Sequence, residues 1–168
     1  MPNLYIITGP AGVGKSTISN TLAKQKNKSA LIEGDDIYNQ VIGSHVSPWK
    51  PGNHLKIFWK ICIDTIKVYL ESGYDVIFNY IVTPENLELI KNNFKEYTIK
   101  FVVLLCNENI LISRDAKRPI DCQMNERCIQ LLNNFKNYNF NKENILDTTN
   151  LAVSEIVTKI DTKNNFII

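Results

Sequence analysis

Residues 9–17 read GPAGVGKST and directly follow the apolar residues LYII at positions 4–7. The pattern G-x-x-x-x-G-K-[ST] between a strand and a helix is the phosphate-binding P-loop. Its glycines let the backbone wrap so closely that successive N–H groups point at one anion, and the positive end of the helix dipole adds to the attraction. The start of this chain is therefore expected to fold as a strand, a tight loop and a helix.

The residue types in this loop also predict its ligand. Lys15 is expected to reach the outer phosphates as a point charge, and the Ser16 hydroxyl to ligate a phosphate-bound Mg²⁺. The expected ligand is a magnesium nucleoside triphosphate. The residues predicted to contact it are Gly9, Ala11, Gly12, Val13, Gly14, Lys15, Ser16 and Thr17.

The length and charge of the chain favour a single domain that acts on a small substrate. A chain of 168 residues can bury an adequate core in one domain, predicted over residues 1–168. The formal net charge of +2 comes without any block of like charge, so neither nucleic acid nor a membrane surface is indicated as a partner. No signal peptide fits before the first strand and no apolar run is long enough for a membrane span, which predicts a cytoplasmic protein.

Apolar periodicity predicts strands that alternate with helices along the whole chain. Strands are expected at residues 4–7, 29–33, 74–78, 99–105 and 145–146. Helices are expected after the P-loop to residues 24–28 and at about 51–73, 84–95, 107–116, 122–135 and 151–160. Such alternation predicts an α/β fold, a five-stranded parallel sheet with helices on both faces and ligands at the carboxyl ends of the strands.

Three carboxylates, Glu33, Asp35 and Asp36, follow the second expected strand. In a parallel sheet they lie on the same edge as the P-loop. Anions beside a triphosphate are unfavourable unless a metal bridges them or one accepts a proton, so the cluster predicts Mg²⁺ positioning and activation of an acceptor hydroxyl. The alternative is an ordinary Asp-rich turn.

All three arginines, Arg114, Arg118 and Arg127, fall within fourteen residues of a chain that otherwise uses lysine as its basic residue. Arginine offers a planar, bidentate fork for phosphate and can stack on a purine, whereas lysine cannot do both. Residues 114–127 are therefore predicted to form a small lid that brings charge to the transferring phosphoryl group and excludes water. The alternative is a solvated basic helix end.

The P-loop, the carboxylates and the arginines together resemble the P-loop small-molecule kinases. This group has an adenylate-kinase-like core and includes shikimate, gluconate and adenylylsulfate kinases and chloramphenicol phosphotransferase. Residues 33–35 resemble its D-x-D after the second strand, with Glu in place of the first Asp, and R-x-x-x-R at residues 114–118 resembles its lid arginines. Residues 123–128 are similar to the post-lid helix of bacterial members.

The resemblance implies ATP as the phosphoryl donor and assigns roles within the site. Lys15, Asp35, Arg114 and Arg118 would be catalytic: Asp35 would orient and deprotonate the acceptor hydroxyl, and the two arginines would contact phosphates or adenine. Mg²⁺ would be held by Ser16, Asp35 and, through water, Glu33. Residues 147–150 resemble the loop beside adenine, which implies a nucleotide contact at Asn150.

The third expected strand departs from the group, since it ends in Asn79 rather than an acidic residue, and no standard Walker B element is present. This departure agrees better with a transferase than with an ATPase that activates water. Asn79 and Tyr80 are candidate contacts of the acceptor because they follow this strand, and Asp36 and Arg127 are further candidates.

The acceptor is expected between the second strand and the long helix. Lys50 or His54 could hold an anionic acceptor, and Trp49 could stack on a ring. Other residues of this region are Tyr38, His45, Asn53 and Trp59.

Two other function classes remain open from the sequence. One is a kinase acting on a nucleic-acid end, which calls for a basic groove, and the other is a nucleotide-binding switch or hydrolase with a protein partner.

Overall fold

The computed structural model describes residues 1–48, 50 and 54–168. Its strands form one parallel sheet in the order β2-β3-β1-β4-β5. The strands are β1 Asn3–Thr8, β2 Ser29–Glu33, β3 Asp75–Asn79, β4 Thr98–Leu105 and β5 Ile145–Asp147. The predicted α/β fold with a five-stranded parallel sheet is thus confirmed.

The α-helices largely follow the predicted order. They are α1 Lys15–Gln25, α2 Gly34–Tyr38, α3 His54–Glu71, α4 Pro84–Asn93, α5 Glu108–Asp115, α6 Glu126–Asn137 and α7 Val153–Thr162. The short helix α2 was not predicted. Helix α6 begins at Glu126 rather than 122, because a 3₁₀ turn occupies Ile120–Cys122 and Asn125 adopts a positive φ of 46°. The predicted start of α3 near Pro51 lies outside the described residues.

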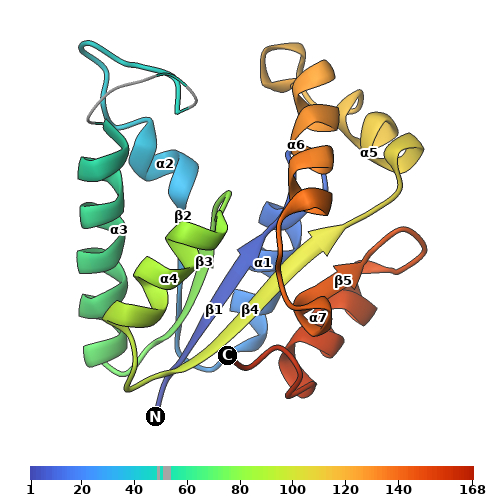
Figure 1. The fold of residues 1–168 in the computed structure, drawn as a ribbon. Coiled ribbons are helices and arrows are strands. Elements are labelled where there is room, and N and C mark those ends of the chain that lie inside the picture. Colours follow the sequence, from blue (N-terminus) through green and yellow to red (C-terminus); the bar gives the residue numbers. More distant parts are fainter. Residues whose placement is uncertain (49, 51–53) are drawn as a thin grey trace.

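Helices cover both faces of the sheet (Figure 1). Buried residues of α3 and α4 share one cluster with the alternate side chains Leu4 and Ile6 of β1. Buried residues of α1 and α7 share the second cluster with Tyr5 and Ile7. Because successive side chains of a strand point to opposite faces, the apolar strands supply two cores at once.

Local signals fix where α3 and α4 end and begin. Gly73 has a φ of +78° and follows the end of α3, a conformation that favours glycine. The Thr83 side chain accepts a hydrogen bond from the backbone N–H of Asn86, and Pro84 occupies the first turn of α4. These signals place α4 immediately after the carboxyl end of β3.

The C-terminal tail pairs with the first half of β4, which β5 does not reach. Phe101 N–H donates to the Phe166 carbonyl oxygen at 2.8 Å, and Lys100 forms an antiparallel bridge with Ile167. The Phe166 side chain is buried in the second core. The tail therefore pairs with β4 at the edge of the sheet and also contributes a side chain to the second core.

Among the described residues, no helix combines the length and apolarity needed to span a membrane.

Candidate functional site

A cleft of about 1440 Å³ lies over the P-loop. The P-loop contributes residues 11–17 to its wall, and α3, α4, the lid and α6 contribute the other sides. Most predicted site residues line this cleft. In addition to the P-loop they are Asp35, Asn79, Tyr80, Arg114, Arg118 and Arg127. Gly9, Glu33, Asp36 and Asn150, which were also predicted for the site, do not line it.

The glycines of the P-loop are required by the backbone. Gly9 has a φ of +145°, and a Cβ built there would lie 2.3 Å from the carbonyl oxygen of Leu104 on the neighbouring strand. Gly12 and Gly14 have φ values of +82° and +106°. These conformations suit glycine, so the loop can wrap toward an anion at the N-terminus of α1.

Lys15 folds back onto the loop, where its Nζ donates to the carbonyl oxygens of Gly9 and Pro10, each at 3.1 Å. Burial lowers the pKa of Lys15 to about 8, while the charges of Asp35 and Glu33 raise it and that of Arg118 lowers it. The ammonium group is therefore desolvated and lies in the field of the Asp35 and Glu33 carboxylates. The two backbone carbonyl oxygens are neutral acceptors for the Lys15 ammonium group, and a phosphate group would give it an anionic acceptor.

Ser16, Glu33 and Asn79 form a small polar network at the ends of three neighbouring elements. The Ser16 hydroxyl donates to Glu33 Oε2 at 3.1 Å. Asn79 Nδ2 lies 2.5 Å from Glu33 Oε2 and 3.1 Å from Ser16 Oγ. The pKa of Glu33 is raised, first by burial and then by Asp36 and Asp35, while the Ser16 hydrogen bond lowers it. Asn79, which stands at the end of β3 where the kinase group has an acidic residue, thus orients the carboxylate of Glu33 on the neighbouring strand β2.

Asp35 sits in the first turn of the unpredicted helix α2 and faces the cleft. Gly34 makes this position possible, because a Cβ there would lie 2.5 Å from the buried Tyr80 ring. In the described part of the chain, Asp35 makes no hydrogen bond to Ser16 or Glu33. The structure therefore joins two of the three predicted metal ligands and holds Asp35 separately in the cleft wall.

Arg114 connects the lid to the P-loop and to the loop after β5. Its Nη1 donates to the Val13 carbonyl oxygen at 3.0 Å and to Thr148 Oγ1 at 3.3 Å. Its Nη2 donates to the Thr148 carbonyl oxygen, also at 3.3 Å. The predicted contact with phosphate or adenine remains a prediction, and these hydrogen bonds add a structural role.

A buried carboxylate, Asp115, organises the rest of the lid. Asp115 Oδ2 accepts hydrogen bonds from the backbone N–H groups of Met124 and Asn125 at 2.9 and 2.8 Å. Arg118 Nη1 lies 3.3 Å from Asp115 Oδ1. The lid therefore folds around the carboxylate of Asp115. The third predicted arginine, Arg127, lies in the first turn of α6 and donates to the side-chain oxygen of Gln130 at 3.4 Å.

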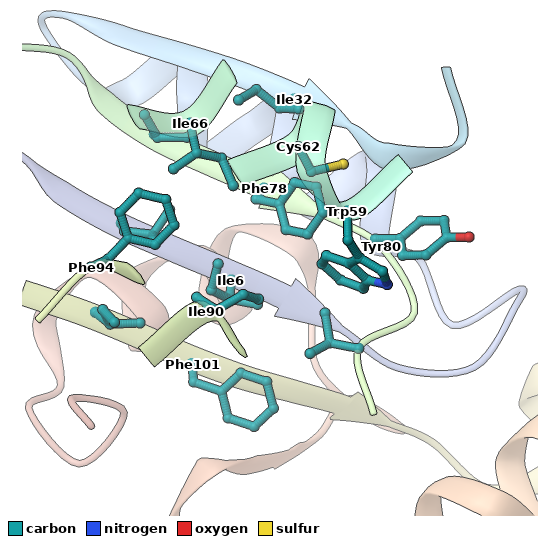
Figure 2. Packing of buried hydrophobic residues seen from close by; sticks show 14 of the residues in the cluster. Ile6, Ile32, Trp59, Cys62, Ile66, Phe78, Tyr80, Ile90, Phe94 and Phe101 are labelled. Atoms are coloured by element: carbon teal, nitrogen blue, oxygen red, sulfur yellow. The ribbon is translucent and has the colours of Figure 1, made fainter. Parts of the chain in front are cut away.

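Aromatic rings form the wall next to Asp35. Tyr80 contacts Phe58 with ring centroids 4.5 Å apart and Trp59 at 5.9 Å. Figure 2 shows that the Tyr80 hydroxyl and the Trp59 indole nitrogen point to the side toward which the β1 arrow runs, where the P-loop lies. Burial and the Asp35 charge raise the pKa of Tyr80. Tyr80 is therefore a neutral hydrogen-bonding group beside the carboxylate.

Only some of the residues predicted to surround the acceptor line the cleft. Tyr38, His45 and Trp59 line the cleft, whereas Lys50 and His54 do not. Trp49 and Asn53 lie outside the described residues. Asp36 and Asn150 are exposed. Sequence reasoning missed Asp115, for which no local signal exists, and named Thr148 only as part of the loop over residues 147–150. It also missed the need for Gly34, which depends on the Tyr80 ring 46 positions later in the chain.

The comparisons with known proteins identify the family and the fold of the chain. A family model described as AAA domain matches residues 6–131. In structure, the chain is similar to a gluconokinase from Sinorhizobium meliloti, at 16% identity and a TM-score of 0.70 over 95% of this chain and 89% of that one. No curated protein matches the sequence significantly.

Two further solved structures share the fold. The tunicamycin resistance protein of Deinococcus radiodurans is 16% identical with a TM-score of 0.67, covering 95% of this chain and 94% of that one. A chain of the Pnkp1/Rnl/Hen1 RNA repair complex is 23% identical with a TM-score of 0.61, over 80% of this chain but only 45% of that one. The resemblance to small P-loop kinases, predicted from the motifs, is thereby confirmed for the fold.

Proposed function

Because the chain belongs to the AAA-domain family of P-loop proteins, we propose that it transfers the γ-phosphoryl group of ATP to a hydroxyl group of a small molecule. The observation that carries the proposal is that Lys15 and Asp35 line one cleft, near enough for the carboxylate to raise the pKa of the ammonium group. A phosphate anchor and a general base that face a common space suit phosphoryl transfer to an acceptor.

On the donor side, the backbone of residues 11–17 and the Lys15 ammonium would bind the phosphates. The Ser16 hydroxyl and the Glu33 carboxylate fit Mg²⁺, because both are oxygen donors and lie 3.1 Å apart. Asn79 would keep Glu33 in place through its amide. Mg²⁺ bound there would neutralise charge that develops on the phosphates.

On the acceptor side, Asp35 would accept the proton of the attacking hydroxyl. The acceptor oxygen forms a bond to the γ-phosphorus while the bond from that phosphorus to the bridging oxygen breaks, which releases ADP. The positive charges of Lys15 and Arg118 would stabilise the charge on the transferred group. Arg118 is held by Asp115 on the lid, so closure of the lid would bring it nearer.

The test is a screen of small hydroxyl compounds for acceptor-stimulated ADP release. Asp35→Asn is expected to lower the stimulated rate by about 10² to 10⁴-fold while ATP binding is retained. Asp36→Asn is the matched control, because Asp36 is the adjacent exposed carboxylate outside the cleft wall. Full transfer activity in Asp35→Asn would rule out the proposed base.

Two alternatives have distinct signatures in the same assay. Phosphorylation of oligonucleotide ends with a steep salt dependence would favour a nucleic-acid kinase. The chain shares its fold with part of a protein from an RNA repair complex. ADP release that no acceptor stimulates, or ATP-dependent association with another protein, would favour a switch or hydrolase.

A further inference from the structure

Three residues that line the cleft are buried aromatic side chains with a polar atom. They are Tyr38, Trp59 and Tyr80, which are 5%, 8% and 6% exposed. The fold uses the Tyr38 hydroxyl, which donates to the carbonyl oxygen of Val46 at 2.5 Å. Among the described residues, neither the Tyr80 hydroxyl nor the Trp59 indole N–H has a hydrogen-bond partner. Two of the three polar atoms are therefore left for a molecule in the cleft.

Packing holds these two donors in place. The Tyr80 and Trp59 rings lie with their centroids 5.9 Å apart, and Phe58 contacts both rings, at 4.5 Å and 5.2 Å. Figure 2 shows the Tyr80 oxygen and the Trp59 nitrogen on the side toward which β1 runs. The P-loop follows β1, so both donors are directed toward the phosphate end of the cleft.

Tyr80 lies beside the proposed base. A Cβ built at Gly34 would lie 2.5 Å from the Tyr80 ring, so this ring packs on the residue directly before Asp35. Burial and then the charge of Asp35 raise the pKa of Tyr80. The hydroxyl group is therefore protonated and able to donate, next to a carboxylate that can accept.

The charge near these donors favours an uncharged oxygen as their partner. An indole N–H can only donate, so the atom that binds Trp59 has to be an acceptor. An anionic oxygen at this place would stand beside the Asp35 carboxylate, whose charge already acts on the Tyr80 hydroxyl, and like charges repel. A neutral oxygen accepts the two hydrogen bonds without that repulsion.

Two lysines of α3 line the same cleft and would suit an anionic acceptor instead. Lys60 pairs with Asp64 at 3.1 Å, and both side chains are exposed. Lys56 is exposed as well. In the described part of the chain, the pKa of Tyr80 responds to the charge of Asp35 and to that of neither lysine. An anionic acceptor bound by the lysines would therefore leave the Tyr80 hydroxyl unused, and experiment can detect this.

We propose that the phosphoryl acceptor is an uncharged small molecule with a second oxygen atom, which accepts hydrogen bonds from Tyr80 Oη and Trp59 Nε1 while the attacking hydroxyl lies at Asp35. This inference rests on the proposed function, because it names the class of acceptor. Two donors and one base hold the molecule by two of its oxygens, which orients the attacking hydroxyl. A compound with a single hydroxyl group would leave both donors unpaired.

Tyr80→Phe tests the first donor, because it removes the hydroxyl and keeps the ring that packs against Phe58 and Gly34. The KM of any acceptor found in the screen should rise about 5- to 100-fold, while ATP affinity is unchanged. Tyr69→Phe is the matched control, because Tyr69 also contacts another ring but does not line the cleft. An unchanged acceptor KM in Tyr80→Phe, or a loss of ATP affinity in its place, overturns the proposal.

The second oxygen is tested by changing the acceptor. An analogue with hydrogen in place of that oxygen should be a poorer acceptor for the unchanged chain, and Tyr80→Phe should reduce its use no further, since the same contact is already lost. An equal effect of Tyr80→Phe on the acceptor and on its analogue contradicts the assignment. So does an analogue with a carboxylate at this position that is used better than the uncharged acceptor.

The second donor is tested by binding alone, with the indole N–H signal of Trp59 in the isotope-labelled full chain. Trp49→Phe assigns this signal, because the chain has two tryptophans. The probes are myo-inositol, cyclohexanol and cyclohexanecarboxylate, which share a six-carbon ring and differ in their oxygens. Myo-inositol should shift the signal saturably, and cyclohexanol and the carboxylate should shift it less. If the three probes act alike, or if none shifts the signal, the proposal is overturned.

These outcomes separate the two proposals. If myo-inositol binds at Trp59 and Tyr80→Phe weakens that binding, but no compound stimulates ADP release, the oxygen site stands and phosphoryl transfer to a small molecule is refuted. If acceptors are found but their KM ignores Tyr80 and the Trp59 signal does not move, transfer is supported and the oxygen site is refuted.

Discussion

Arg114 Nη1 lies 3.0 Å from the carbonyl oxygen of Val13, so the lid helix α5 is tied directly to the P-loop. The same guanidinium donates to the carbonyl oxygen and the hydroxyl of Thr148. This one side chain joins three segments that a nucleotide would touch. The shape of the P-loop therefore depends on a residue of the lid.

Replacement of Arg114 by lysine should lower stability even without nucleotide. A single ammonium cannot reproduce the fork that serves Val13 and Thr148, so a loss of about 1–2 kcal/mol is expected. Thermal unfolding measures it, with Arg118→Lys as the control because Arg118 is half-exposed and pairs with Asp115 through Nη1. An unchanged melting temperature with a reduced kcat would instead assign Arg114 to phosphate contact alone.

Asp115→Asn should loosen the lid. The buried carboxylate accepts two backbone N–H groups, and an amide in its place turns one acceptor into a donor that faces them. The expected cost is about 1–3 kcal/mol, measured by thermal unfolding, together with a higher KM for ATP. Asp121→Asn is the control, since Asp121 is an exposed carboxylate of the same segment. Equal stability of both variants would contradict the role given to Asp115.

Gly34→Ala should destabilise the chain by about 1–3 kcal/mol, because the new methyl group would overlap the Tyr80 ring. The accompanying shift of Asp35 should also reduce acceptor-stimulated ADP release. Gly43→Ala is the matched control, because a Cβ there meets nothing within 4 Å. If the two variants have the same unfolding midpoint and the same rate of acceptor-stimulated ADP release, this packing argument is refuted.

ATP affinity should fall at alkaline pH. The protonated form of Lys15 binds phosphate, and burial lowers its pKa to about 8 in the nucleotide-free chain. Affinity should therefore be constant below pH 8 and then fall by up to about ten-fold per pH unit, with proton uptake on binding. Binding titrations in two buffers of different ionisation heat measure both quantities, and a flat profile to pH 9.5 would contradict the assignment.

The stability of the nucleotide-free chain should respond with the opposite sign. The unfolded chain holds the Lys15 proton up to its usual pKa near 10.5, so between about pH 8 and 10.5 the unfolded state binds more protons than the folded one. Folding stability should then rise with pH across this window. The difference between the unchanged chain and Lys15→Met isolates the effect from other groups.

Asn79→Asp should make stability depend on Mg²⁺. The substitution places a second carboxylate at the position that now lies 2.5 Å from Glu33 Oε2, and like charges at that distance repel. The variant should melt lower than the parent without metal and gain more from MgCl₂. Asn92→Asp, an exposed change on α4, is the control. An equal response to MgCl₂ in both variants would argue against a metal beside Glu33.

Most of the fold could be predicted because its signals are local. The strand over residues 29–33 has the bounds expected from the sequence, and Thr83 caps α4 as its side chain and the following proline indicate. Helix α2 was missed because Gly34 and two aspartates are typical of a turn. The late start of α6 was missed because Asp115 holds the preceding backbone from a distance.

The sequence by itself determined the phosphate-binding loop, the parallel sheet and the edge at which the polar residues gather. These depend on glycine conformations, apolar periodicity and chain direction, which act between neighbours in the chain. Tertiary structure alone decided that Arg114 supports Val13, that Asn79 orients Glu33 and that residues of α3, α4 and α6 line one cleft with the P-loop. Those relationships join segments tens of residues apart, and a distance between such side chains exists only once both cores of the sheet have formed.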